Sequence, residues 1–201
     1  MKAAITADIV NSTSLSAVKY KQLINSIREL FKGDDLEVYR GDSFQVLVYN
    51  AEEALYKSLQ ARLAAINCSD QKRIDIRMSI SLGEPKSVSK SIGSNMDQLF
   101  VRSGRYFDKF KNGTRRLYIT SGNEGIDFTF EIIAEYIDSL METVTPKQAE
   151  VLSYMLSGKS QVEIAKLLNK TTATINQHVK TSRYNEFESM LSKFKILTHQ
   201  L

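Results

Sequence analysis

The strongest constraint on the fold of this chain is an alternating stretch at residues 73–82. Apolar side chains occupy every second position, and polar or charged side chains occupy the positions between them. Successive side chains of a β-strand point to opposite faces, so this pattern predicts a strand with one buried face. The apolar positions are Ile74, Ile76, Met78, Ile80 and Leu82.

Further strands and helices are predicted on both sides of this strand. Residues 2–10 form an apolar run of strand length, and residues 36–48 alternate about the turn Gly41-Asp42 as a hairpin does. The order strand, helix, hairpin, helix, strand, helix, strand predicts a ferredoxin-like α+β fold. Apolar spacing places the helices at 14–32, 51–67 and 96–110, with a loop rich in Ser, Lys and Gly at 86–95 and the last strand at 115–120.

The remainder of the chain is predicted to be helical. Thr145 with Gln148, and Ser160 with Glu163, have the spacing of capping boxes that start helices. Two short helices after a longer one make a helix-turn-helix architecture. The expected organisation is an α+β domain at 1–128, a connecting amphipathic helix at 129–144, and an all-α helix-turn-helix domain at 145–201. Within that last domain the helices are expected at 146–158, 161–168, 173–183 and 185–201.

Charge is distributed unevenly along the chain. Residues 145–201 hold eight of the 27 Lys and Arg residues and four of the 23 Asp and Glu residues, so they carry the whole net charge of +4. This excess suggests an anionic partner, most often nucleic acid; a solvated basic surface is the alternative. The single cysteine, Cys68, excludes an internal disulfide. No apolar run is long enough to span a bilayer, so a cytoplasmic protein is expected.

The predicted third helix of the helix-turn-helix presents the side chains expected of a DNA-reading helix. Asn and Gln can bond adenine, and Lys and Arg neutralise phosphates. The segment 145–183 resembles the helix-turn-helix of LuxR-type and sigma-factor-like regulators, and double-stranded DNA is the expected partner. A three-helix bundle that contacts another protein is the alternative. The predicted DNA-binding residues are Thr172, Thr174, Asn176, Gln177, Lys180, Thr181 and Arg183.

Two acids mark a second candidate site in the first half. Asp8 ends the first strand and Asp42 lies at the hairpin turn, so the two carboxylates can converge at one sheet edge and share a divalent metal. The alternative is that Asp8 caps a helix and Asp42 stabilises a turn.

These motifs resemble the class III nucleotide cyclase domain and its relative, the GGDEF domain. The resemblance covers residues 2–120 and rests on residues 7–13, Gly41-Asp42-Ser43-Phe44, residues 77–84 and Ser103-Gly104-Arg105. It implies Mg or Mn bound by Asp8, Ile9 and Asp42. It further implies a nucleotide whose phosphates meet the amides of Val10, Asn11, Ser12 and Thr13, and Arg105 placed against the transition-state charge.

The chain departs from that family at the positions used for catalysis. Val101 stands in place of the transition-state asparagine, and Val38 replaces the base-selecting lysine. Against the GGDEF motif, Arg40 replaces the first glycine and Ser43 replaces the glutamate. These changes suggest binding without cyclisation.

Taken end to end, the chain resembles the SatD family, which combines such a domain with a C-terminal helix-turn-helix. The motifs are residues 5–10, Arg40 to Gln45, Ser103 to Arg105 and Thr145 to Val179. The expected function is that of a homodimeric transcriptional regulator whose degenerate cyclase-like domain senses a nucleotide or metal. The alternative is an active, divergent metal-dependent cyclase or nucleotidyl transferase regulated by its helix-turn-helix.

Overall fold

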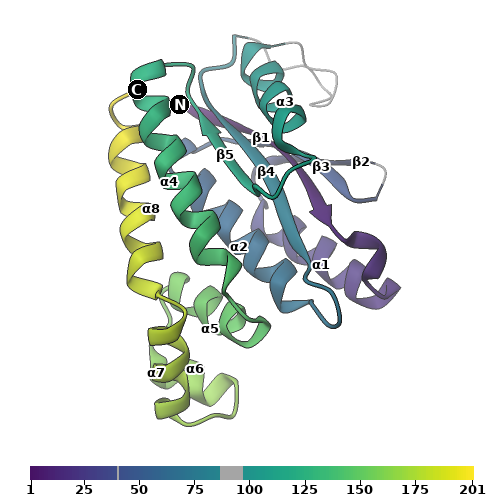
Figure 1. Cartoon of the computed structure of the whole chain (residues 1–201), viewed down its shortest axis with the longest axis vertical. Helices are drawn as coiled ribbons and strands as arrows, with labels where there is room; N and C mark the ends of the chain where they lie inside the picture. Colours follow the sequence, from purple (N-terminus) through teal and green to yellow (C-terminus); the bar gives the residue numbers. More distant parts are fainter. Residues whose placement is uncertain (40, 87–96) are drawn as a thin grey trace.

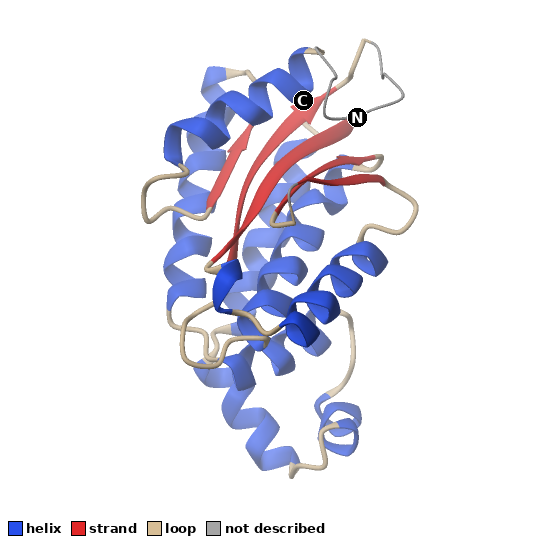
Figure 2. Cartoon of the chain, turned by 90° about the vertical axis from the view of Figure 1, so that its right-hand side faces the viewer, coloured by secondary structure: helices blue, strands red, loops and turns tan. Residues whose placement is uncertain are grey.

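A computed structural model of the chain describes residues 1–39, 41–86 and 97–201. Arg40 and nearly all of the predicted 86–95 loop lie outside these residues. The described chain is a mixed α/β structure in which helices cover both faces of one sheet (Figures 1 and 2). No helix in the described ranges is long and apolar enough to cross a membrane.

The sheet has five strands in the order β2-β3-β1-β4-β5. All neighbours are antiparallel except β4 and β5, which are parallel. Gly41 has a φ of 84° in the β2–β3 turn, a conformation that favours glycine. The strands are β1 (Lys2–Val10), β2 (Asp35–Tyr39), β3 (Ser43–Val48), β4 (Asp75–Gly83) and β5 (Leu117–Thr120).

Side chains alternate between the two faces of the sheet, and each face is covered by its own set of helices. The main core contains Ile76, Met78 and Ile80 of β4, as the pattern predicted, and they pack with the face covered by α1, α2 and α4. The opposite face carries Ala4 and Leu47, which pack against α3. The helices are α1 (Ala17–Leu30), α2 (Ala54–Asn67), α3 (Gln98–Phe110) and α4 (Glu124–Glu142), with short 3-10 turns η1 (Ser12–Ser14) and η2 (Ala51–Glu53).

Helix α4 begins five residues earlier than the predicted start at residue 129. The Asn123 side chain accepts a hydrogen bond from the Gly125 N–H at 3.2 Å, which caps the helix at that point. Phe130 and Ile137 of α4 lie in the main core beside the sheet. Helix α4 therefore packs on the sheet, and it also connects the sheet to the C-terminal helices.

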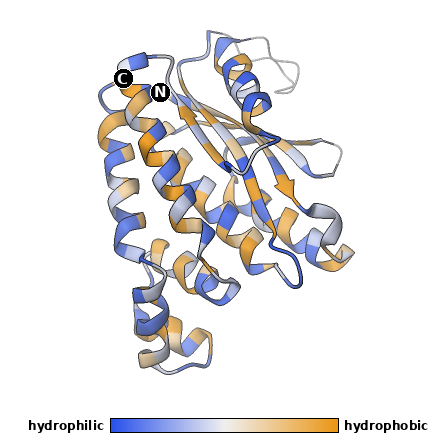
Figure 3. Ribbon diagram, in the orientation of Figure 1, coloured by the Kyte–Doolittle hydropathy of each residue, from blue (hydrophilic) through white to orange (hydrophobic). Residues whose placement is uncertain are grey.

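The C-terminal helices divide between two cores. Ala149 and Leu152 of α5, with Phe187 and Phe194 of α8, belong to the main core. Helices α6 and α7 close a separate small core. Figure 1 shows α8 returning along α4, and Figure 3 shows hydrophobic and hydrophilic residues alternating along both. These helices are α5 (Pro146–Leu156), α6 (Gln161–Leu167), α7 (Thr172–Thr181) and α8 (Tyr184–Thr198).

A buried ion cluster joins three of these elements, namely α2, β4 and α4. Arg62 of α2 is 1% exposed and donates to both carboxylate oxygens of Asp75 in β4, at 2.9 and 3.0 Å. Its third contact is Asp138 of α4, at 2.6 Å. Burial alone would lower the pKa of Arg62, but the two carboxylates raise it above its usual value. The guanidinium therefore stays charged between two acids.

Replacing Arg62 with Ala should strongly destabilise the fold, because two buried carboxylates would lose their counter-charge. We expect a loss of about 3–5 kcal/mol in the free energy of unfolding, measured by urea denaturation. Arg28→Ala, at an exposed position on α1, should change the free energy of unfolding by less than about 0.5 kcal/mol. Equal effects of the two substitutions would contradict a structural role for the cluster.

Candidate functional site

Charged side chains gather at one end of the sheet. Strand β1 ends there at Val10, which is paired in register with Asp75 at the start of β4. Strand β5 begins close by, since Met78 pairs with Leu117. The hairpin turn is also at this end, because the Ile9 N–H donates to the Asp42 carbonyl oxygen at 2.8 Å.

Asp8 is engaged by an arginine on the neighbouring strand. The Arg77 guanidinium lies directly across from Asp8 and donates to its two carboxylate oxygens at 3.1 and 3.2 Å. Asp42 has a different set of contacts: it accepts from the Ser12 hydroxyl at 3.3 Å and from the Ser43 hydroxyl at 3.4 Å. The two predicted metal ligands thus lie on adjacent backbone segments, but each carboxylate has its own protein partner.

A divalent metal at this edge would have to replace Arg77 as the partner of Asp8. Within the described ranges, no group of three or more His, Cys, Asp or Glu side chains is arranged to hold a metal ion. The donor set therefore comprises at most Asp8, Asp42 and the Ile9 carbonyl that the resemblance implies. The metal site stays a prediction that depends on whether Arg77 can be displaced.

The predicted phosphate-binding residues follow directly after β1. Asn11 has a left-handed backbone, with φ of 61°, and its side-chain amide donates to the Arg73 carbonyl at 2.8 Å. Val10 precedes it, and Ser12 and Thr13 begin the short turn η1. This arrangement reverses the chain at the charged end of the sheet.

Arg105 lies on α3, away from these groups. Ser103, two residues earlier, is buried and donates to the Thr6 hydroxyl at 2.8 Å and the Ser79 carbonyl at 3.0 Å, so that side of α3 faces the sheet. Residues two apart do not share a helix face, and Arg105 is exposed. No contact among the described residues joins Arg105 to Asp8 or Asp42.

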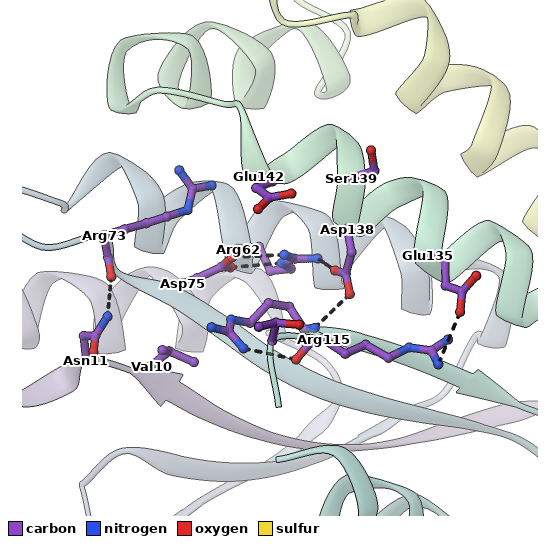
Figure 4. Close-up of a pocket in the computed structure, with 12 residues that line it drawn as sticks. Val10, Asn11, Arg62, Arg73, Asp75, Arg115, Glu135, Asp138, Ser139 and Glu142 are labelled. Atoms are coloured by element: carbon purple, nitrogen blue, oxygen red, sulfur yellow. Dashed lines mark hydrogen bonds and ion pairs between the residues drawn. The ribbon is translucent and has the colours of Figure 1, made fainter. Parts of the chain in front are cut away.

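A cavity of about 530 Å³ opens beside this charged end (Figure 4). It is bordered by the end of β1, the start of β4, residues 114–116 before β5, and helix α4. This cavity was not predicted from the sequence, where the only signal was the charged face of residues 73–77 and the pair Arg115-Arg116. Its lining comprises Val10, Asn11, Arg62, Arg73, Asp75, Thr114, Arg115, Arg116, Glu135, Asp138, Ser139 and Glu142.

Two of the lining arginines have shifted pKa values. Burial lowers the pKa of Arg73 and Arg116 from the usual value for a guanidinium. The negative charge of Asp75 opposes the shift, and the positive charge of Arg62 adds to it. Acidic and basic side chains are therefore interleaved in the lining of the cavity.

The predicted DNA-binding residues divide into free and engaged side chains. Gln177 and Lys180 are exposed on α7 and form no side-chain hydrogen bond among the described residues. Thr174 is exposed as well, but its hydroxyl shares a hydrogen bond of 2.9 Å with the Thr171 hydroxyl. The Asn176 amide donates to Gln161 of α6 at 3.2 Å. Two others lie at the helix ends: Thr172 begins α7 and is exposed, and Thr181 ends it.

Thr181 and Arg183 link α7 to other helices. The Thr181 hydroxyl accepts from the Gln148 amide of α5 at 2.9 Å. Arg183 donates to the Tyr136 hydroxyl of α4 at 2.7 Å and to the Glu186 carboxylate at 3.0 Å. The hydrogen bond to Glu186 raises the pKa of Arg183. Both side chains thus have structural contacts, and sequence alone did not distinguish them from the free ones.

Helices α5 and α6 begin at the capping boxes predicted from the sequence. Both capping boxes form, at Thr145 with Gln148 and at Ser160 with Glu163. The Ser160 backbone and side-chain donors lower the pKa of Glu163, so this carboxylate stays charged at the start of α6. Helices α5, α6 and α7 share a small core of Val151, Ile164, Ala165, Ile175 and Val179.

No protein-family model matches the sequence, and a search of curated proteins found no match. The solved structure of the guanylyl cyclase Cya2 is similar with a TM-score of 0.39 and 14% sequence identity. The similarity covers 59% of this chain and 73% of that chain. A TM-score of this size is too low to carry an argument, and the SatD resemblance stays a prediction from the motifs.

Removing Arg77 tests the predicted metal site. In Arg77→Gln, Asp8 loses its counter-charge and both of its oxygens become available to a hard cation. If the site binds metal, the variant should bind Mn²⁺ about tenfold more tightly than the unmodified protein, or about 1.4 kcal/mol in binding free energy, measured by titration calorimetry. Adding Asp8→Asn should remove the gain. No Mn²⁺ binding by a folded Arg77→Gln protein would show that the metal prediction is wrong.

Proposed function

We propose that this protein is a DNA-binding transcriptional regulator in which α7 is the recognition helix. The observation that carries the proposal is the exposed face of α7, where Thr174, Gln177 and Lys180 offer donors and acceptors and no acid is present. Helix α7 packs on α6 through a small core to which Val151 of α5 also contributes. The α6–α7 pair has the form in which a recognition helix enters the major groove.

The charge around α7 supports the same proposal. Residues 145–183 contain six basic and two acidic residues, and the Glu163 carboxylate is used in the α6 cap. Phosphate contacts from lysines would supply affinity, and the side chains of α7 would read bases. The exposed lysines of this segment are Lys147, Lys159, Lys166, Lys170 and Lys180.

The position of α6 and α7 leaves room for a duplex. Figure 1 shows both helices at the end of the molecule opposite α3 and the N-terminus. Among the described residues, Asn176 bonds Gln161, Thr181 bonds Gln148, and Thr174 bonds Thr171 at the cap of α7 itself. The free face between them is the surface that we propose meets DNA.

We propose that the first half is a cyclase-like sensing domain without cyclase activity. Its β1-α1-β2-β3-α2-β4 order and the sheet order β2-β3-β1-β4 support a ferredoxin-like, cyclase-like assignment. Val38 pairs with Phe44 in the hairpin, where the resemblance expects a base-selecting lysine. The alternative, metal-dependent nucleotidyl chemistry, would require Asp8 to exchange Arg77 for a metal ion.

The proposed regulator acts as a homodimer, because helix-turn-helix proteins commonly read two half-sites. Support comes from exposed apolar side chains on α4 and α8: Phe128 is 66% exposed, Ile132 52% and Ile196 56%. Ile132 and Ile196 line a groove of about 380 Å³ that Lys193 also lines. Helix α4 carries six acidic and no basic residues. A second copy related by a two-fold axis through the groove would bring each Lys193 toward the acidic α4 of the other.

Substituting Lys180 tests DNA binding by α7. The unmodified protein should retard genomic DNA fragments with an affinity that falls steeply as salt rises. Lys180→Gln should weaken binding on all sequences and reduce the slope of log affinity against log salt by about 1, because one phosphate contact is lost. Gln177→Ala should instead change which fragments are preferred.

Lys21→Gln is the matched control, since it removes one exposed lysine from α1 in the other half of the chain. Its affinity and salt slope should equal those of the unmodified protein. Absence of any salt-dependent retardation by the unmodified protein would reject the proposed function.

A charge placed in the α4–α8 groove tests dimerisation. Ile132→Glu should convert the dimer to a monomer in sedimentation velocity, because the second copy would bury an unpaired carboxylate. Val18→Glu, at an apolar position on α1 that is 68% exposed, should leave the dimer intact. A monomeric unmodified protein, or a dimer that survives Ile132→Glu, would contradict an interface at this groove.

A further inference from the structure

Arg73, which is exposed, and Arg116, which is partly buried, line the cavity of Figure 4 and form no ion pair with a carboxylate in the described chain. Arg116 donates from Nη1 to the carbonyl oxygens of Gly113 and Arg115, at 3.1 and 3.2 Å. Arg73 donates to the carbonyl oxygens of Met141 at 2.5 Å and Val144 at 2.8 Å. Carbonyl groups satisfy hydrogen bonds, but they do not neutralise the charge.

The buried acids of the cavity form no ion pair with Arg73 or Arg116, because their oxygens have other partners. Both oxygens of Asp75 are taken by Arg62. Asp138 accepts from Arg62 on one oxygen, and on the other from the backbone N–H groups of Arg116 and Leu117, at 2.8 and 3.0 Å.

The acids at the rim do not pair with Arg73 or Arg116 either. Glu135 is within 3.7 Å of Arg115, which also bonds Glu131. Glu142 is exposed and forms no ion pair within the described ranges. The four arginines and four acids of the lining balance in formal charge, but Arg73 and Arg116 are left without an ion-pair partner among the described residues.

We propose that this cavity binds a small molecule bearing a phosphate group, held between Arg116 and Arg73. A guanidinium presents N–H donors in a planar fork that matches phosphate oxygens. The Nε and Nη2 groups of Arg116, and the Nε group of Arg73, make no hydrogen bond among the described residues and are the donors available to it. Thr114 and Ser139 add hydroxyl groups to the lining.

The dimensions and composition of the cavity restrict the ligand further. A volume of about 530 Å³ exceeds what an inorganic phosphate needs, so the phosphate belongs to a larger molecule. No aromatic side chain from the described part of the chain lines the cavity, so the recognition we propose is mainly of the anionic group. The ligand class is a phosphorylated small molecule recognised mainly through its anionic group.

The same contacts connect this cavity to the helix-turn-helix, and this step rests on the proposed function. Met141 and Val144 stand at the end of α4, immediately before the Thr145 cap of α5. Arg73 therefore holds the junction from which the DNA-binding helices begin. A phosphate that draws Arg73 away from these carbonyl oxygens would loosen the junction, and it would thereby alter how α5 to α7 are presented to DNA.

Inorganic pyrophosphate is the probe for the binding test, with acetate as the carboxylate control. By titration calorimetry without DNA, the unmodified protein should bind pyrophosphate, and Arg116→Gln should weaken that binding at least tenfold. Arg28→Gln, which removes an exposed arginine on α1, should bind as the unmodified protein does. Equal affinity in Arg116→Gln, or acetate binding as strong as pyrophosphate binding, would overturn the proposal.

A second measurement separates lost binding from lost folding. Pyrophosphate should raise the thermal midpoint of the unmodified protein and not that of a folded Arg116→Gln variant. Pyrophosphate should also change DNA retardation by the unmodified protein but not by Arg116→Gln. Failure of pyrophosphate binding would overturn the cavity proposal alone, while failure to retard DNA at any pyrophosphate concentration would overturn the proposed function alone. Bound pyrophosphate with unchanged DNA affinity would overturn the coupling between them.

Discussion

The buried charge of Arg62 is the interaction on which the rest of this structure depends. Its guanidinium joins α2, β4 and α4, because Asp75 and Asp138 both bind it in a setting with little water. Asp138 also receives the backbone N–H groups that begin β5. Removing a charge from water is costly, so such a cluster is stable only when every member is paired. Helices α2 and α4 and strand β4 are therefore held in the arrangement that pairs Arg62 with Asp75 and Asp138.

That requirement shapes the charged end of the sheet. Once Arg62 has taken Asp75 and Asp138, the neighbouring Arg73 and Arg116 have only backbone carbonyls as partners. Arg77 is different, because it pairs with Asp8 across two strands. Arg73 and Arg116 thus remain without an ion-pair partner among the described residues, whereas Arg77 is paired on the Asp8 side. The same end of the sheet therefore offers two chemically different surfaces.

The helices after residue 144 are joined to this structure more closely than two independent domains would be. Helices α5 and α8 contribute side chains to the main core, while α6 and α7 have a core of their own. Arg183 reinforces the connection by bonding Tyr136 of α4. A change at α4 can therefore reach α7 through rigid helices, whereas the outward face of α7 stays free.

The sequence by itself determined the type and order of the elements, because apolar period and capping chemistry are local. The β4 alternation, both capping boxes and the acid-free face of α7 were readable without the fold, whereas the start of α4 was misplaced. Tertiary structure alone decided which charges meet. Arg62 and Asp138 are 76 residues apart, and Asp8 and Arg77 are 69 apart. Periodicity gives the face of a side chain but not its partner, so the ion pair at Asp8, the contacts of Arg183 and the arginine cavity appeared only when the chain was folded.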